Sequence, residues 1–520
     1  MKDDITENEG VQETTANVQP AVVPKEYLAP FILVTTLFAL WGFANNFTDP
    51  MVKVFKDVFA ISNAQSSIVQ MAFYGGYATM AIPAAIFIRK YSYKSGIVVG
   101  LTLFATGALL SIPAANMVNF WLFIFGIYIL TFGLAFLETT ANPFILSMGA
   151  EKTSTMRLNL AQAFNPIGSL GGAFIAASFV LTNVHVADFK ADVTGFKEDL
   201  SASETKTADL NVLPFLKAKD RARKEDPNVK AYVSEKNAYF TEKGEGEVTV
   251  DQALVDFREG KIDSYQGMSF NELQRHDLNL VSTTYMTLGF IVLATLVVFL
   301  IKKMPDSSKQ GSDDQDLNLG ATASRLLKNP RYVGGVLAQM FYVGAQIMVW
   351  TFILQYAEKE LGMDNATAGN HQIAALVIFL TFRFICTYFL RFVSPGKLLS
   401  VLAVGGVLTT LGAIHITGMS GLYSLMLVSA CMSLMFPTIY GIALEGIGQD
   451  AKLGSAGLIL AIVGAVWLTG FQGRILDLES FMGTTATRGS FYLSVGCFII
   501  IGIYGFLCRN PRADAPTQNV

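Results

Sequence analysis

The chain has 520 residues, of which 52% are hydrophobic and 15% are charged, and its formal net charge is −3 at pH 7. Soluble globular proteins average roughly 45–50% apolar and about 25% charged residues, so this composition indicates a membrane protein. The slightly negative charge gives no basis for a nucleic-acid partner. The sequence has no GxxxxGK[ST] phosphate loop, so ATP hydrolysis is not expected to power it.

The cysteines and histidines also exclude several classes of site. All four cysteines fall in or at the end of apolar segments, so we expect no disulfide framework. The four histidines show no metal-ligand spacing, and we expect neither a metal nor any other cofactor. Residues 1–24 are polar and acidic, without the apolar core of a signal peptide, and predict a disordered tail.

Apolar segments of membrane-spanning length recur along the rest of the chain. A hydrocarbon core of about 30 Å needs about 20 apolar residues in a helix. The sequence predicts twelve such spans, at 27–58, 64–88, 95–115, 119–148, 155–182, 278–302, 331–358, 364–391, 397–418, 420–447, 454–476 and 486–508. The predicted fold class is therefore an all-α polytopic membrane protein with twelve transmembrane helices.

Short matches suggest that the twelve helices form two related halves. Asn63-Ala64 recurs as Asn365-Ala366, and Arg89 recurs as Arg391, at equivalent helix ends. We therefore expect two pseudo-symmetric six-helix halves. The predicted organisation is a disordered tail at 1–24, a first half at 25–302, a linker at 303–330, a second half at 331–510 and a tail at 511–520.

Basic residues in the short loops predict the orientation. Lys and Arg concentrate in loops on the side of the linker, which places that linker and both termini in the cytoplasm. Residues 183–277, highly charged and preceded by five spans, then form an extracytoplasmic insertion within the first half. Val212–Phe215 and Ala253–Phe257 are each apolar enough to anchor a short helix there. A partly ordered insertion is the favoured interpretation, and a dedicated binding cap is the alternative.

The first span carries a carboxylate at membrane depth. Asn46, Asp49 and Lys53 fall on one helical face, while Met51 and Val54 fall on the other. Holding an ionised group in hydrocarbon costs at least about 2.5–3.5 kcal/mol. The polar face is therefore predicted to line a wet cavity, with Asp49 in a dry environment between bulky neighbours in the sequence.

The fourth span carries a second buried acid. Glu138 shares a face with Asn142, and Pro143 cannot donate a hydrogen bond to the carbonyl of Thr139. Both Asp49 and Glu138 lie deep in their spans and approach the middle of the membrane from opposite ends. We expect both carboxylates to be functional.

Amide and aromatic side chains on several spans predict a polyhydroxylated ligand. Amides present paired donors and acceptors that suit neighbouring hydroxyl groups, and aromatic rings pack against the C–H faces of a sugar. The alternative is that these amides only join helices. The candidate ligand-binding residues are Trp41, Asn46, Tyr74, Glu138, Asn142, Gln162, Asn165, Gln346 and Trp350.

One arginine lies inside the eighth span. Arg383 must face the bundle interior or an inner vestibule, because exposure to lipid is costly. We expect it to form a structural or gating ion pair, with direct ligand contact as the alternative.

The segments that carry these residues resemble a known family. FALWGFANNFTD, SIVQMAFYGGY, LETTANPF, RLNLAQAFN, FYVGAQ and FPTIYGIALEGIGQDAKLGS are similar to segments of the sugar–proton symporter family of the major facilitator superfamily, in the branch of the fucose permeases. The resemblance covers all twelve spans but not 183–277. The sequence departs from the superfamily pattern at Arg89, where an Asp is usual, and at Pro50, beside the key acid.

The resemblance implies a transporter rather than an enzyme. It implies proton-coupled import of L-fucose by alternating access across a bacterial inner membrane, by a monomer whose partners are sugar, protons and the lipid bilayer. Asp49 and Glu138 match the family's two proton-coupling carboxylates, and Asn46, Gln162 and Asn165 match cavity amides. We expect Glu138 to contact sugar and Asp49 mainly to carry the proton. Alternatives are another hexose or an amino sugar as substrate, a sugar sensor of the same fold, or an intramembrane hydrolase using both acids.

Overall fold

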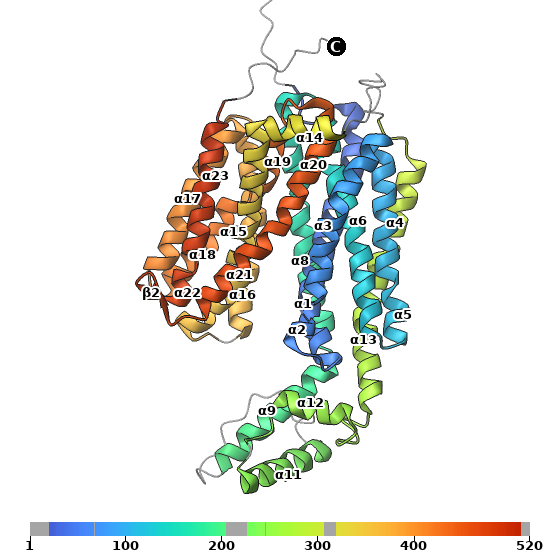
Figure 1. Ribbon diagram of the computed structural model, residues 1–520, viewed down its shortest axis with the longest axis vertical. Helices are drawn as coiled ribbons and strands as arrows, with labels where there is room; N and C mark the ends of the chain where they lie inside the picture. Colours follow the sequence, from blue (N-terminus) through green and yellow to red (C-terminus); the bar gives the residue numbers. More distant parts are fainter. Residues whose placement is uncertain are drawn as a thin grey trace, which may run out of the picture.

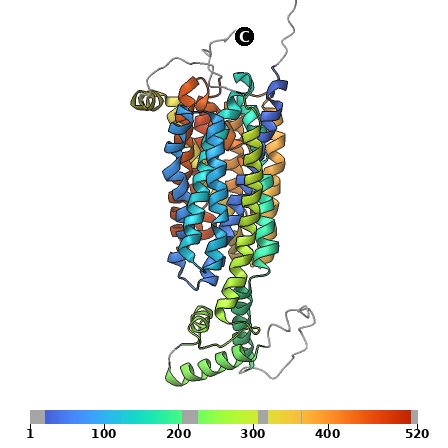
Figure 2. The ribbon, with the colours of Figure 1, turned by 90° about the vertical axis from the view of Figure 1, so that its right-hand side faces the viewer.

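The structure is a computed structural model that describes residues 20–66, 68–203, 226–244, 246–305, 319–363 and 365–510. Within these residues, twelve helices are long and apolar enough to cross a membrane, which confirms the predicted number of spans. The helices run side by side in two bundles (Figures 1 and 2).

The first bundle contains the six spans before the linker. After the short η1 (Lys25–Tyr27), the spans are α1 (Leu28–Val58), α3 (Ile68–Lys90), α4 (Tyr93–Leu109) with α5 (Ser111–Asn116), α6 (Phe120–Ser147), a fifth span of η2 (Glu151–Thr153), α7 (Ser154–Gln162), α8 (Asn165–Ile175) and the π-helical η3 (Ala176–Leu181), and α13 (Phe270–Ile301). The short α2 (Asn63–Ser66) precedes α3.

The second bundle follows α14 (Leu319–Lys328), which lies across the end of the molecule where the described chain begins and ends (Figure 1). Its spans are α15 (Pro330–Leu361), α16 (Asn365–Phe389), α17 (Pro395–His415), α18 (Met419–Met432) with α19 (Met435–Leu444), a span of η5 (Gly448–Asp450), α20 (Ala451–Leu460), η6 (Ala461–Val463) and α21 (Gly464–Leu476), and α22 (Ala486–Gly489) with α23 (Tyr492–Leu507). A hairpin of β1 (Ser480–Phe481) and β2 (Thr484–Thr485) pairs Ser480 with Thr485.

Proline residues break two of these spans at corresponding places. Pro166, at the start of α8, has no N–H to donate to the carbonyl of Gln162, and Pro437, in α19, leaves the carbonyl of Ser433 free in the same way. Each carbonyl lies at the junction between two helices of its span. Both breaks face the interface between the bundles, where freed acceptors can be used.

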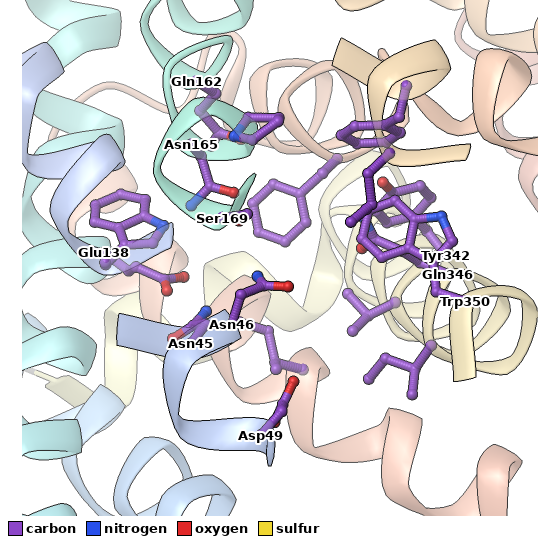
Figure 3. Close-up of a pocket in the computed structure, with 18 of the residues that line it drawn as sticks. Asn45, Asn46, Asp49, Glu138, Gln162, Asn165, Ser169, Tyr342, Gln346 and Trp350 are labelled. Carbon is purple, nitrogen blue, oxygen red and sulfur yellow. The ribbon is translucent and has the colours of Figure 1, made fainter. Parts of the chain in front are cut away.

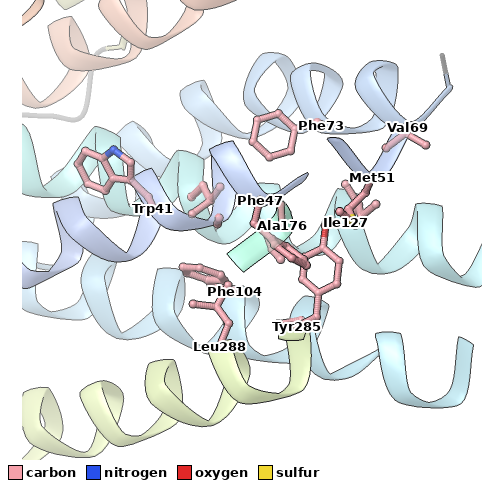
Figure 4. Packing of buried hydrophobic residues seen from close by; sticks show 14 of the residues in the cluster. Trp41, Phe47, Met51, Val69, Phe73, Phe104, Ile127, Ala176, Tyr285 and Leu288 are labelled. Atoms are coloured by element: carbon pink, nitrogen blue, oxygen red, sulfur yellow. The ribbon is translucent and has the colours of Figure 1, made fainter. Parts of the chain in front are cut away.

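Side chains from α1, α3, α4, α6 and α13 form the core of the first bundle (Figure 4). Phe47 and Met51 are fully buried there, and the ring of Phe47 meets that of Tyr285 edge-on at 5.0 Å. Thr48 Oγ1 lies 2.9 Å from the hydroxyl of Tyr285. The apolar face of α1 is thereby fixed against α13, which turns its polar face toward the second bundle.

Three glycines bring α1 and α8 into backbone contact. A Cβ atom at Gly168 would lie 1.9 Å from the carbonyl oxygen of Ala39, and one at Gly42 would lie 2.2 Å from that of Asn165. Gly172 approaches the carbonyl oxygen of Phe43 in the same way, at 2.3 Å. Small residues allow this close packing in membrane helices. The polar faces of α1 and α8 are therefore held at a fixed separation.

The described part of the segment between the fifth and sixth spans is mainly helical and projects beyond the end of the first bundle opposite α14 (Figures 1 and 2). It contains α9 (His185–Ser203), α11 (Pro227–Lys243) and α12 (Val250–Arg258), so the prediction of a helix around Ala253–Phe257 is confirmed. The one around Val212–Phe215 lies outside the described residues. We call this segment, residues 183–277, the insertion.

The insertion is joined to α1 and α13 by polar contacts. Asp277 accepts hydrogen bonds of 2.9 Å from the backbone N–H groups of His185 and Val186, and Gln274 donates to the carbonyl oxygen of Val58 at 2.6 Å. Lys190 Nζ lies 2.7 Å from Asp57 Oδ1 at the end of α1. The sixth span begins earlier than predicted, because a capping box of Ser269 and Glu272 starts α13 inside the insertion.

Candidate functional site

A cavity of about 210 Å³ lies between the two bundles, lined by side chains from both (Figure 3). The wall from the first bundle is mainly polar: Trp41, Asn45, Asn46, Asp49, Phe73, Tyr74, Tyr77, Glu138, Gln162, Asn165, Pro166 and Ser169. The wall from the second bundle is mainly apolar and aromatic: Tyr342, Val343, Gln346, Ile347, Trp350, Leu376, Phe379, Arg383, Phe436 and Ile462. Of the described residues of the insertion, none lines the cavity.

Asp49 projects from α1 into the open part of the cavity (Figure 3). Its side chain is exposed, and among the described residues it has no hydrogen-bond or salt-bridge partner. The expectation of a dry environment was therefore wrong. The bulky neighbours Phe47 and Met51 point into the core on the other face of the helix, so adjacency in sequence did not describe the surroundings of Asp49.

Glu138 is enclosed, with 4% of its surface exposed. Its Oε1 accepts a hydrogen bond of 2.7 Å from the hydroxyl of Tyr77 on α3. Burying a charge without partners is costly, and a hydrogen-bond donor offsets part of that cost. The environments of the two acids thus differ: Asp49 faces water, and Glu138 is held by a neighbouring helix.

Asn142 does not line the cavity as predicted but lies behind it. Its Nδ2 donates to the carbonyl oxygen of Glu138 at 2.9 Å, and its Oδ1 accepts from Gln162 Nε2 at 2.8 Å. One N–H of Gln162 makes this hydrogen bond, so its Oε1 and its second N–H remain available to a ligand in the cavity. Asn142 lies on the same face of α6 as Glu138, as predicted. Its amide, however, hydrogen-bonds to other groups of the protein.

On α8, two polar side chains reach back to α1. Asn165 Nδ2 donates to the carbonyl oxygen of Phe38 at 3.2 Å, and Ser169 Oγ donates to that of Gly42 at 3.3 Å. Together with Asn46 they complete the polar wall, in which acceptor oxygens are available to a ligand (Figure 3).

The opposite wall carries the predicted Gln346 and Trp350 on α15 (Figure 3). The indole N–H of Trp350 donates to Ser429 Oγ at 3.2 Å, and its ring meets that of Phe379 edge-on at 4.9 Å. These contacts fix the ring of Trp350 beside the cavity. Trp41 and Tyr74 lie on the polar wall as predicted candidates.

Arg383 forms no ion pair with any described carboxylate. Its Nε donates to the carbonyl oxygen of Ser433 at 2.5 Å, and its Nη1 donates to that of Gln162 at 2.8 Å. The predicted ion pair is therefore replaced by two backbone acceptors. These are the carbonyls that Pro437 and Pro166 leave free, one in each bundle, so Arg383 joins the two bundles at the end of the cavity.

Further hydrogen bonds join the bundles between Arg383 and the end of the molecule that carries α14. Asn159 Nδ2 donates to Thr438 Oγ1 at 3.1 Å, and Glu151 Oε1 accepts from the backbone N–H of Gly446 at 2.7 Å. On the linker, Thr322 Oγ1 accepts from Arg89 Nη1 at 2.7 Å, and Arg325 pairs with Asp450 at 2.7 Å. The bundles are thus closed against each other on this side of the cavity.

The list of candidate ligand-binding residues drawn from the sequence omitted Tyr77 and Asn45, although both fall on the polar faces of their spans. Both line the cavity, and Tyr77 is the described side chain that bonds to the Glu138 carboxylate. Asn45 belongs to the same polar stripe as Asn46 and Asp49. Tyr77 lies one turn from Tyr74 on α3, and this spacing places both on the face that lines the cavity.

Comparisons with known proteins agree with this architecture. The sequence profile described as Major Facilitator Superfamily matches residues 32–187. An L-fucose-proton symporter of Haemophilus influenzae is 42% identical over 93% of this chain and 97% of its own length, and one of Escherichia coli is 31% identical over 92% and 93%.

A solved structure has the same fold. The crystal structure of a Major Facilitator Superfamily transporter, FucP, in the outward conformation superposes with a TM-score of 0.71 at 30% identity, covering 94% of this chain and 100% of that chain. This chain is therefore a membrane transporter and not an enzyme, and it belongs to the L-fucose–proton symporter family of the major facilitator superfamily.

Proposed function

We propose that the protein imports L-fucose together with protons by alternating access. The observation that carries this proposal is the pairing of two unlike walls: a polar wall with two carboxylates and several amides faces a wall of aromatic and aliphatic side chains. A 6-deoxyhexose has both kinds of surface, since its hydroxyl groups suit amides and its C–H groups suit aromatic rings. The similarity to L-fucose-proton symporters supports the same substrate.

The two carboxylates supply the coupling. A carboxylate that loses contact with water as the cavity closes is costly while charged, and binding a proton removes that cost. Asp49 faces the open cavity and can exchange protons with water, while Glu138 lies deeper and can contact sugar. We propose that both acids must be neutral before the loaded cavity can close.

The closed side of the molecule is proposed to be cytoplasmic. The side that carries α14 holds the cross-bundle contacts and the ends of the described chain (Figure 1), and basic residues concentrate in its loops. Both termini then lie in the cytoplasm of a bacterial cell and the insertion lies outside it. Because one chain contains both bundles and the complete cavity, the monomer is the proposed transport unit.

Uptake into proteoliposomes tests this function. With an inward proton gradient, labelled L-fucose should accumulate above its external concentration, and collapse of the gradient should abolish accumulation but not exchange. Unlabelled L-fucose should compete more strongly than galactose, glucose or an amino sugar. Stronger competition by another hexose would reassign the substrate. Binding of L-fucose without any flux would indicate a sensor.

A further inference from the structure

Tyr77 holds one of the two oxygens of Glu138. The two side chains come from different helices, α3 and α6, and are 2% and 4% exposed. Tyr77 Oη donates to Glu138 Oε1 at 2.7 Å. The two helices approach closely there, because a Cβ atom at Gly76 would lie 2.7 Å from Thr131. A tyrosine has only one hydroxyl hydrogen, and this contact occupies it.

The chemistry of the two groups sets the direction of this hydrogen bond. An ionised carboxylate can only accept, so the hydroxyl hydrogen of Tyr77 points to Glu138 Oε1. Asn45 on α1 also lines the cavity, and its buried Oδ1 has no partner among the described residues.

The second oxygen of Glu138 is left for the cavity. Among the described residues, no group donates to Oε2, and Glu138 lines the cavity. A neutral carboxyl group carries its proton on one oxygen, and Oε1 is already an acceptor. We infer that Tyr77 is a positioning residue that reserves Glu138 Oε2 for the transported proton and for a hydroxyl group of the sugar. This inference rests on the proposed proton-coupled function.

Other groups near Glu138 do not replace Tyr77 in this role. The titratable or charged groups that face it from the packed helices are Asp49 on α1, Tyr74 on α3, Arg383 on α16 and Tyr440 on α19. None of these donates to the Glu138 carboxylate, and Arg383 is bound to two carbonyl oxygens. Tyr77 is thus the side chain to change.

Tyr77→Phe removes the donor and keeps the ring. A neutral carboxyl group depends less on that donor than a carboxylate does, so Glu138 should keep its proton to higher pH. The pH midpoint of proton-driven L-fucose uptake should move up by about one unit, that is about tenfold in proton affinity. Gradient-independent exchange of L-fucose should fall less than proton-driven uptake does, because Tyr77 acts on the sugar only through Glu138. Tyr93→Phe is the matched control, because Tyr93 is a buried tyrosine outside the cavity whose hydroxyl has no hydrogen-bond partner among the described residues.

A double-mutant cycle separates positioning from packing. In the Glu138→Gln background there is no proton to position, so adding Tyr77→Phe should change L-fucose affinity and exchange by less than about twofold. Equal losses in both backgrounds, or an unchanged pH midpoint in Tyr77→Phe alone, would overturn the inference. If Tyr77→Phe does not fold, 3,5-difluorotyrosine incorporated at position 77 tests the same contact with a stronger donor. The midpoint should then move to lower pH, and no movement would count against the inference.

The proposed function itself is checked separately. Wild-type protein that fails to accumulate L-fucose would overturn that function, whatever Tyr77 does. Wild-type accumulation with an unchanged midpoint in Tyr77→Phe would overturn only the role of Tyr77.

Discussion

The guanidinium group of Arg383 donates to the carbonyl oxygen of Gln162 across the interface between the two bundles, at 2.8 Å. The same group binds the carbonyl oxygen of Ser433 within its own bundle. Both acceptors exist because a proline four residues later lacks an N–H. A hydrogen bond to a charged donor contributes about 1.5–3 kcal/mol, so this contact stabilises the conformation closed on the side of α14.

Arg383→Met should open that side of the molecule. Methionine keeps much of the volume of arginine but cannot donate, and loss of about 1.5 kcal/mol would shift the balance between closed and open states roughly tenfold. Thr155 lies against Gly441 of the other bundle and is 8% exposed, so a cysteine placed at position 155 reports opening. In a variant that lacks the native cysteines, its reaction with a maleimide should be faster after Arg383→Met.

Arg391→Met is the control for this experiment. Arg391 follows the end of α16, where it is exposed and stacks on Tyr388. The Arg391→Met variant should leave the rate of maleimide labelling at position 155 unchanged. Equal acceleration by both variants would mean that loss of positive charge, rather than of the cross-bundle contact, causes opening.

Asp49→Asn should uncouple transport without preventing sugar binding. The side chain of Asp49 is exposed and has no partner among the described residues, so an amide of the same shape should not disturb the fold. We expect loss of gradient-driven L-fucose accumulation and an affinity close to that of the wild type. Glu138→Ala should instead weaken binding, since each sugar hydroxyl left unpaired in a closed site costs about 1–3 kcal/mol. Calorimetry on both variants checks this, and greater loss of affinity in Asp49→Asn would reverse the assigned roles.

The ion pairs of Lys190, which help to attach the insertion, should be insensitive to pH across the neutral range. Partial burial disfavours the charged form of Lys190, but its contacts with Asp251 and Asp57 outweigh this and raise the pKa of Lys190. The hydrogen bond from Lys190 lowers the pKa of Asp251. The Asp251 contribution is present above about pH 4 and is lost as pH falls through its lowered pKa, whereas the Lys190 contribution is present below about pH 10 and is lost as pH rises through its raised pKa.

Hydrogen exchange in α9 and α12 measures this attachment. Exchange protection should stay constant between about pH 5 and 9, after correction for the intrinsic rate, and should fall at more acidic pH. Lys190→Met should lower the protection of both helices. Lys197→Met is the control, because Lys197 contacts an exposed Glu247 at 3.3 Å within the insertion. Equal effects of the two variants would show that Lys190 has no special role in attachment.

A shortened insertion should still permit transport. Replacing 187–268 by a Gly/Ser linker keeps Gln274 and Asp277, whose contacts lie at the base of the insertion. Asp57→Asn in the same variant avoids leaving a buried carboxylate without Lys190. Because the described part of the insertion does not line the cavity, uptake of L-fucose should remain measurable. A well-folded shortened protein that no longer binds sugar would restore the alternative of a binding cap.

The sequence predicted the helices better than the surroundings of individual side chains. Twelve spans follow from apolar length alone, because a membrane requires each helix to cover about 30 Å. The start of α13 was missed because the capping box lies in polar sequence, where no apolar pattern marks it. The predicted domain boundaries remain predictions.

In the site, periodicity identified the faces that line the cavity but not the partners of each group. Trp41, Asn46 and Gln162 line it as predicted, whereas Asn142 is turned toward Gln162. The partner of Arg383 is a backbone carbonyl from a distant span, and no sequence pattern encodes a contact between residues 162 and 383. Such pairings depend on how the two bundles meet.

The glycine contacts between α1 and α8 bear on how this transporter can be given a new substrate. Any side chain larger than hydrogen at Gly42, Gly168 or Gly172 would force the two helix backbones apart. These three glycines are therefore poor targets for mutant libraries, because a larger side chain at any of them would displace the polar wall. The wall built by α15 and α16 has no such constraint at Ile347 and Leu376. Laboratory evolution toward bulkier sugars should accumulate its first successful substitutions on that wall.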